Sequence, residues 1–260
     1  MRRLIAAVLL TTLPSFAGIT FTAKTISDEG GDVMVRALVS GSRAKVTFLQ
    51  NGKVASAGDY MLSPDQGTTL YLISPGTRTY TRYDTRAMLS GMGQMVQGMR
   101  GMMRVTFESP KVEKLIDEDG GLIAGLRTRH YRYRTSYVAS MHVTGDKKAT
   151  TEIEEDIWTT TALSDPALAI WLKKDPAPTG DQQLDTMIKT EMNKVQGFPL
   201  RRITVTHMHD ATGAERNSRV EMQVTQLKRT PIAAAEFVIP KSYKEIPNKR
   251  LFEEIGRAHV

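Results

Sequence analysis

Residues 33–48, VMVRALVSGSRAKVTF, decide the fold class of this chain. Apolar residues recur at every second position in both halves of the stretch, at Val33, Val35, Ala37 and Val39 and again at Ala44, Val46 and Phe48. Side chains that alternate in this way point to opposite faces of a β-strand. The stretch therefore predicts two strands with one buried face each. Asn51-Gly52, a pair that tolerates positive φ, predicts a tight hairpin turn directly after them.

The same alternation continues along most of the chain. Residues 70–73 and 77–83 flank Pro75-Gly76, and residues 112–116 and 122–137 flank Asp119-Gly120, so each set predicts a hairpin. Further strands are predicted at residues 152–160, 200–209 and 219–227. Consecutive hairpins favour an antiparallel meander.

Three predicted helices interrupt the strands. Ser164-Asp165-Pro166 is a typical helix start and leads into residues 168–173. Asp181 is a candidate cap for a second helix, which Gly197 is expected to end. We interpret residues 164–197 as a helical hairpin that lies on the sheet.

The third predicted helix, residues 85–103, is rich in methionine. Five methionines spaced by 4, 3, 4 and 3 residues form one helical stripe, and Val96 lies at its edge. Four glycines in the segment cost about 1 kcal/mol each relative to alanine, whereas each buried methionine returns about 1.5 to 3 kcal/mol. We therefore predict that the helix forms only against an apolar surface and gates an apolar cavity. The candidate ligand-binding residues are Met88, Met92, Met95, Val96, Met99 and Met102.

Two other interpretations of this segment stay open. Apolar stripes at helical spacing are usually core, in which case the methionines fill a gap and bind nothing. Alternatively, the thioethers of Met88, Met92 and Met95 could converge on Cu(I), a soft metal ion that accepts such ligands.

The N-terminus predicts export. Arg2 and Arg3 precede the apolar run Leu4–Leu13, and Ser15-Phe16-Ala17 has the small residues that a signal peptidase accepts. We expect residues 1–17 to be a cleaved signal peptide and the mature protein to be periplasmic. The chain has no cysteine, which excludes disulfides, thiolate metal sites and lipid attachment at a cysteine.

The net charge of +7 indicates an anionic partner. Export argues against nucleic acid and leaves an anionic membrane surface or an envelope polymer. The most basic stretch, residues 127–134, places arginines on both faces of a predicted strand, so we interpret it as a solvated strand face.

The sequence has no convincing catalytic set. His207 and His209 could share a strand face, but their position predicts a packed His207 and a loop His209 more than a metal site. Phosphate-loop, dinucleotide and hydrolase motifs are not found, so we expect a protein that is not an enzyme and needs no cofactor. Residues 255–260 look like translated sequencing-adapter read-through, and we expect the natural chain to differ after about Glu253.

Several short motifs resemble the superfamily of periplasmic lipoprotein carriers (LolA/LolB-like), within an uncharacterised branch of exported proteins. They are residues 31–51, 71–80 (YLISPGTRTY), 123–125 leading into 127–133, and 237–243 (FVIPKSY). The resemblance implies one domain, residues 18–250, with an α+β, mainly antiparallel fold: an open curved sheet, or half-barrel, that wraps helices around an apolar cavity. Ser242 replaces the glycine usual before that tyrosine, and nothing matches the arginine that controls opening in the carriers, so lipoprotein transport does not carry over.

These observations lead to three hypotheses. The first is a soluble, monomeric periplasmic carrier that holds an apolar, lipid-like ligand in the half-barrel beneath the methionine-rich helix. The second is a structural or interaction module of the envelope with a filled core, in which the edge strands or the basic surface dock a partner protein or an anionic surface. The third is handling of Cu(I) through the methionine thioethers.

Overall fold

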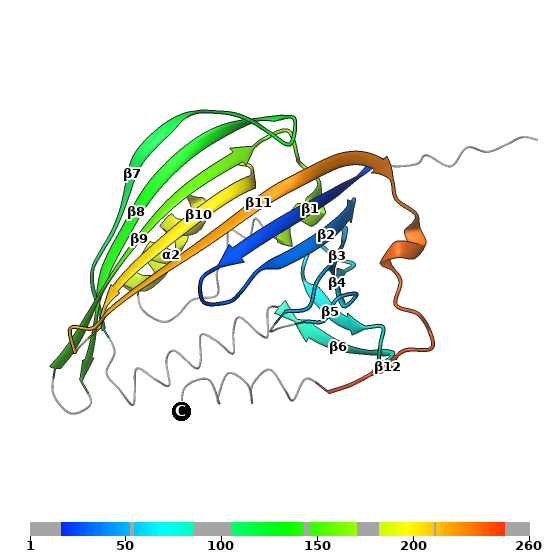
Figure 1. The fold of residues 1–260 in the computed structure, drawn as a ribbon, viewed down its shortest axis with the longest axis horizontal. Coiled ribbons are helices and arrows are strands. Elements are labelled where there is room, and N and C mark those ends of the chain that lie inside the picture. The colour runs from blue at the N-terminus through cyan, green and yellow to red at the C-terminus, as the bar shows by residue number, and fades with distance from the viewer. Residues whose placement is uncertain are drawn as a thin grey trace, which may run out of the picture.

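The computed structural model describes residues 17–52, 55–85, 106–142, 146–170, 182–210 and 212–247. These residues form one sheet of twelve strands in the order β12-β6-β5-β4-β3-β2-β1-β11-β10-β9-β8-β7 (Figure 1). The strands are β1 Ala17–Ser27, β2 Val33–Ser40, β3 Arg43–Phe48, β4 Tyr60–Ser63, β5 Thr69–Ser74, β6 Thr79–Asp84, β7 Thr106–Ile123, β8 Leu126–His142, β9 Asp146–Thr160, β10 Phe198–His209, β11 Glu215–Pro231 and β12 Lys244–Glu245. The helical segments are η1 Pro166–Ile170, α2 Gln182–Asn193 and η2 Ala234–Phe237.

Two antiparallel meanders build the sheet. Strands β1 to β6 follow one another outward from β1, and strands β7 to β11 follow one another back toward it. The meanders join where β11 pairs with β1, with one register shift between Thr22 and Ala23. Only β12 departs from the antiparallel arrangement, since it pairs with β6 in parallel. Antiparallel pairing of consecutive strands is therefore confirmed within β1 to β6 and within β7 to β11, whereas β6 and β7 are not neighbours and the pairing of β1 with β11 was not predicted.

The hairpin predicted at Asn51-Gly52 is present as the antiparallel pair β3–β4, but the tight turn predicted for these two residues is wrong. Gly41 and Ser42 make the two-residue turn between β2 and β3, where Gly41 has a φ of 59° and Ser40 pairs with Arg43. Asn51 and Gly52 instead lie in the longer connection to β4, and Gly52 is not in the left-handed region. There the Asn51 Oδ1 atom accepts a hydrogen bond of 2.8 Å from the Ala57 N–H, so its side chain organises the loop.

The predicted turn at Asp119-Gly120 is also wrong. Strand β7 continues through both residues, with a register shift between Asp119 and Gly121, and it turns at Ala124-Gly125. These two residues have φ values of 49° and 80°, as a type I′ hairpin requires. A β-bulge accommodates Gly120, so β7 continues beyond it.

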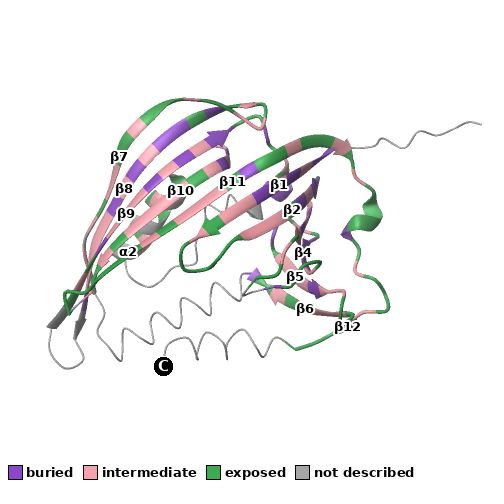
Figure 2. Cartoon of the chain, viewed as in Figure 1, coloured by how far each residue is buried: buried purple, intermediate pink, exposed green. Residues whose placement is uncertain are grey.

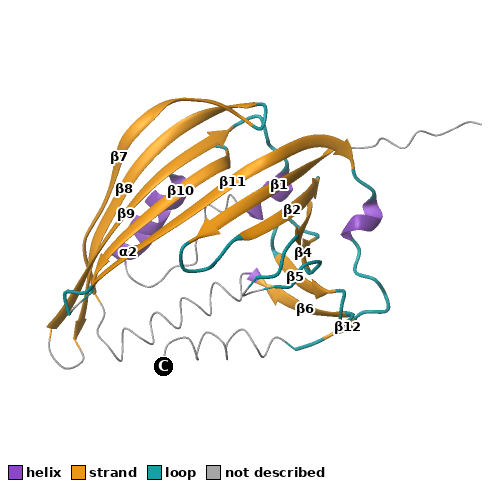
Figure 3. Ribbon diagram, viewed as in Figure 1, coloured by secondary structure: helices purple, strands orange, loops and turns teal. Residues whose placement is uncertain are grey.

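The expected α+β half-barrel that wraps helices, as in the LolA-like carriers, is contradicted. The described chain is almost entirely sheet, and its helical segments are one α-helix and two short 3-10 turns (Figure 3). Strands β7, β8 and β9 are 18, 17 and 15 residues long, and β7 contains three register shifts along its pairing with β8.

The structure describes only parts of the predicted helical hairpin at residues 164–197, so the hairpin stays a prediction. Its first member is the 3-10 turn η1, and its second is α2, which ends four residues before Gly197. Residues 171–181 and the methionine-rich residues 86–103 lie outside the described residues. Among the described helices, none combines the length and apolar character needed to cross a membrane.

The main core lies on the face of the sheet that bears Phe21, which we call the inner face. The predicted alternation is confirmed here, because Ala37, Val39, Ala44 and Val46 are all buried (Figure 2). Phe21 meets Phe198 of β10 edge to face, with ring centroids 5.5 Å apart. The loop and turn residues Leu163, Ala167 and Leu168 complete this cluster.

A second, smaller core lies on the opposite, outer face. The segment after β11 carries η2, whose Phe237 is buried with Tyr60, Leu62 and Ile73 of β4 and β5. The segment then ends beside β6, where the Lys244 N–H donates to the Arg78 carbonyl at 3.0 Å. The C-terminal part of the described chain is thus a strap across the outer face (Figure 1).

We expect Gly197→Ala to destabilise the fold strongly. Gly197 has a φ of 89°, and an added Cβ atom would lie 2.5 Å from the Thr160 carbonyl oxygen. The left-handed backbone costs about 1 to 2 kcal/mol for alanine, and the steric conflict adds about 1 to 3 kcal/mol. Gly213→Ala is the matched control, since its φ is 83° but nothing lies within 4 Å of an added Cβ. Urea unfolding should show a clearly larger decrease in the free energy of unfolding for Gly197→Ala than for Gly213→Ala. Equal decreases in the two variants would contradict the steric explanation.

Candidate functional site

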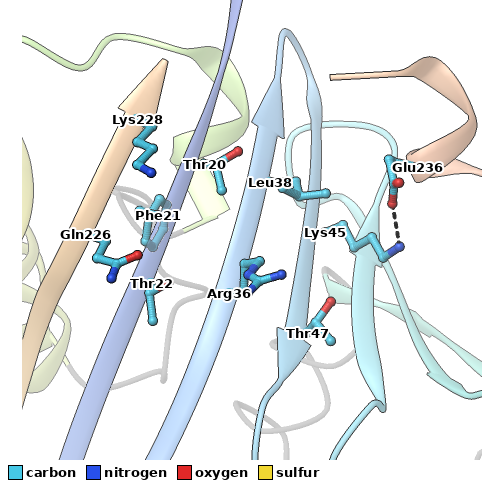
Figure 4. A pocket seen from close by; sticks show the side chains of 10 residues that line it. All are labelled: Thr20, Phe21, Thr22, Arg36, Leu38, Lys45, Thr47, Gln226, Lys228 and Glu236. Atoms are coloured by element: carbon cyan, nitrogen blue, oxygen red, sulfur yellow. Dashed lines mark hydrogen bonds and ion pairs between the residues drawn. The ribbon is translucent and has the colours of Figure 1, made fainter. Parts of the chain in front are cut away.

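A pocket of about 520 Å³ lies on the outer face of the sheet, across strands β11, β1, β2 and β3 (Figure 4). We call it the basic pocket. The register of the strands arranges its residues in two parallel rows. One row is Lys228, Thr20, Leu38 and Lys45, and the other is Gln226, Thr22, Arg36 and Thr47, with Glu236 of η2 at the rim.

Strand alternation explains why polar residues gather here. On β1, Ile19 and Phe21 are buried on the inner face, so Thr20 and Thr22 between them face outward. The neighbouring strands follow the same rule, and register places their outward residues side by side. The outward-facing polar residues of β11, β1, β2 and β3 thus form one continuous polar surface.

The three cations of the basic pocket differ in their partners. The Lys45 Nζ atom lies 2.9 Å from the Glu236 Oε2 atom and 4.7 Å from the Tyr60 ring centroid. Arg36 and Lys228 are exposed, and neither forms an ion pair or hydrogen bond with any residue in the described ranges. The pocket therefore holds three positive charges and one negative charge, and two of its cations are free to bind a ligand.

Neutral hydrogen-bonding groups lie between the cations. The side chains of Thr20, Thr22, Thr47 and Gln226 form no hydrogen bond to other described parts of the chain. The lining residues include no histidine, cysteine or serine, and their one carboxylate is paired with Lys45. This arrangement can bind an anion or a hydroxyl-rich molecule.

A buried charged cluster lies on the inner face below α2. The Lys194 ammonium, with 2% of its side chain exposed, pairs with both Glu155 and Glu191. The Tyr133 hydroxyl donates to the Lys194 carbonyl, and Thr204 reaches Glu155 at 3.4 Å. These contacts hold the end of α2 on the sheet, so we assign them a structural role.

The basic stretch at residues 127–134 is part of a ladder of paired charges on the outer face. His130 stacks on Trp158 with a centroid distance of 4.3 Å, and its Nε2 atom lies 2.7 Å from the Asp156 Oδ1 atom. Arg132 donates to the same carboxylate oxygen at 2.8 Å, and Arg134 pairs with Glu154. Three of the four arginines in this segment are therefore paired with carboxylates, since Arg129 also pairs with Asp117, and Arg127 is the exception among the described residues.

The carboxyl group of Asp156 shows how firmly this ladder is paired. Burial opposes its ionisation, but hydrogen bonds and charge from Arg132 and His130 outweigh that effect. The pKa of Asp156 therefore lies below its ordinary value.

The residues predicted to bind an apolar ligand, Met88, Met92, Met95, Val96, Met99 and Met102, lie outside the described residues. The apolar-carrier and Cu(I) hypotheses therefore stay predictions. The predicted signal peptide up to residue 16 and the suspected artefact at residues 255–260 also lie outside them. Strand β1 begins at Ala17, one residue before the predicted mature N-terminus.

The prediction of a packed His207 is wrong. Both His207 and His209 are exposed on β10. The His207 Nδ1 atom lies 2.8 Å from the Asn217 side-chain oxygen, and the His209 Nδ1 atom lies 3.6 Å from Glu215. Both histidines thus face residues of β11.

The sequence analysis missed the basic pocket. The sequence pattern that could have revealed it is the set of polar residues, such as Thr20 and Thr22, that alternate with apolar residues along each strand. That pattern is typical of any solvated strand face. Only the pairing of β1 with β11, about 200 residues later in the chain, brings Gln226 and Lys228 beside these threonines.

Comparison with known proteins leaves the function open. No family model matches the chain, and no curated protein matches it. Among solved structures, the chain is similar to an uncharacterized conserved protein from Thermus thermophilus, with 11% sequence identity. The similarity covers 90% of this chain and 91% of that chain, with a TM-score of 0.38.

We expect the stability lost in Asp156→Asn to depend on pH. At pH 7 the loss should be about 2 kcal/mol, because charge-assisted hydrogen bonds to Arg132 and His130 disappear. A carboxyl group with a lowered folded-state pKa stabilises the fold above its unfolded pKa of about 3.9, and this effect is lost as the pH falls through the folded-state value. The difference between variant and wild type in urea unfolding should therefore shrink below about pH 4.

Asp32→Asn is the control for this measurement. Asp32 pairs with Lys24 at 3.1 Å, but 47% of its side chain is exposed, so the change should cost less than about 1 kcal/mol. A loss for Asp156→Asn that stays constant between pH 7 and pH 3 would contradict a role for the ionised carboxylate.

Proposed function

We propose that this protein is an exported, non-enzymatic binding module that docks an anionic partner of the cell envelope in the basic pocket. One observation carries the proposal: Arg36 and Lys228 are exposed and unpaired on one sheet face, within the described chain, beside a third cation, Lys45. Such cations attract a negatively charged partner without first having to release a carboxylate of their own.

The expected binding is weak and depends on salt. An exposed ion pair contributes about 0.2 to 1 kcal/mol, so two or three contacts, aided by the neighbouring hydroxyl groups, support reversible docking. Salt screens exposed charges with a Debye length of about 8 Å at physiological ionic strength. The affinity should therefore fall steadily as salt is added.

The edges of the sheet are poor alternatives for docking. Strand β7 has three register shifts and contains Pro110, and these features disrupt a continuous row of free backbone groups. At the other edge, β12 is two residues long and is followed by Pro247. Because both edges resist strand addition, the outer face is the better docking surface.

We expect the double variant Arg36→Gln/Lys228→Gln to bind immobilised dextran sulfate about tenfold more weakly than the wild type at 50 mM NaCl. The affinity should also depend less steeply on salt, since two ionic contacts are lost. Biolayer interferometry over a range of NaCl concentrations measures both effects.

The matched control is Arg82→Gln/Lys241→Gln, which removes two exposed positive charges outside the basic pocket. Its net charge equals that of the pocket variant, and its affinity should stay within about twofold of the wild type. Equal losses in the two variants would show that binding follows net charge alone and would overturn the proposal.

A further inference from the structure

We infer that the occupant of the basic pocket is an anionic glycan, a linear sugar polymer with carboxylate groups, and that one of these carboxylates replaces Glu236 at Lys45. The inference rests on the proposed function and names the ligand of the same site. Three features carry it: the spacing of the cations, the neutral groups between them, and the carboxylate that Lys45 already holds.

The spacing of the cations calls for a ligand with several charges. Lys228 and Lys45 occupy one cross-strand row on β11 and β3, three strand spacings apart. At about 4.8 Å per spacing, their backbones are separated by about 14 Å. Arg36 lies between them in the second row, and Glu236 holds Lys45 toward the rim (Figure 4). A single carboxylate or phosphate could contact all three cations only if their side chains left these positions and converged, whereas a chain with repeated charges can contact them where they lie.

The groups between the cations favour a sugar chain. Thr20, Thr22, Thr47 and Gln226 offer hydroxyl and amide groups that can bind sugar hydroxyls, and Leu38 adds one apolar contact. Single-stranded nucleic acid is usually bound through stacking on exposed aromatic rings. The one aromatic lining residue, Phe21, is 4% exposed and packs on Phe198 of the inner face.

The position of the pocket disfavours a peptide that binds by strand addition, and it disfavours a membrane surface. Peptides that bind by strand addition need a free sheet edge. The basic pocket instead lies in the middle of the sheet, where β1, β2 and β3 are already paired on both sides. Lys45 lies beside η2 with 19% of its side chain exposed, which keeps it from a flat lipid surface.

Glu236 marks where a ligand carboxylate binds. Its carboxylate lies 2.9 Å from the Lys45 Nζ atom, while 47% of its own side chain is exposed. An incoming carboxylate can form the same contact once Glu236 swings into solvent. Glu236 thus competes with the ligand for Lys45. The affinity for the glycan is lowered by the free energy needed to break the Lys45–Glu236 ion pair.

The variant Glu236→Gln tests this competition. We expect it to bind hexagalacturonate about threefold to fivefold more tightly than the wild type, because the neutral amide competes less for Lys45. In a Lys45→Gln background the same change should give no gain. The control Glu245→Gln removes a negative charge from the same strap, where Glu245 contacts the Tyr80 hydroxyl at 3.3 Å, and should leave the affinity within about twofold. Thermal unfolding checks that each variant is folded.

A comparison of probes tests the ligand class. Calorimetry should show hexagalacturonate binding at least about tenfold more tightly than galacturonate monomer, since the longer chain reaches several cations. Hexaglutamate, hexathymidylate and phosphatidylglycerol vesicles, each at matched charge, should bind more weakly.

Equal affinity for monomer and hexamer, tighter binding of another probe class, or no effect of Glu236→Gln would overturn the inference. If dextran sulfate binding still depends on Arg36 and Lys228 in that case, the proposed function stands and only the glycan assignment fails. If no probe depends on these two residues, the proposed function itself fails.

Discussion

The pairing of β1 with β11 is the constraint on which the rest of the structure depends. It joins the two meanders into one sheet, and without it each would end in an open edge. On the inner face it brings Ile19 and Phe21 together with Val224 in the main core. On the outer face it places Gln226 and Lys228 beside Thr20 and Thr22, which completes the basic pocket. One set of backbone hydrogen bonds thus determines both the largest buried cluster and the candidate site.

The presence of charged side chains does not by itself identify a binding surface. Residues 127–134 are more basic than the pocket, yet Arg132 and Arg134 are held by carboxylates from β9. In the basic pocket two of the three cations keep no such partner within the described chain. The difference comes from the neighbouring strand: β9 presents Asp156 and Glu154 to β8, whereas β1 presents threonines to β2 and β11.

Local pattern predicted the strands well and their arrangement poorly. Alternation at residues 33–48 identified β2 and β3 with their buried face, and the helical periodicity after Asp181 identified α2. Gly120 suggested a turn, but β7 pairs with β8 on both sides of this glycine, and a bulge between Asp119 and Gly121 accommodates it. Periodicity shows which residues share a face and carries no information on the partner strand, so neither the β1–β11 pair nor the basic pocket was predicted. The most prominent motif, the methionines from Met88 to Met102, drew the functional hypothesis to a different part of the chain.

The long separation between β1 and β11 also governs how the chain reaches its folded state. During synthesis, β1 leaves the ribosome roughly 190 residues before β11, an interval of about 10 to 40 s at common elongation rates. Throughout that interval β1 can pair with β2 but has an unsatisfied edge on its other side. Sheets built on such distant contacts fold slowly and expose aggregation-prone edges. Keeping the nascent chain from self-association, by a chaperone or by delayed folding, is thus a requirement of this topology.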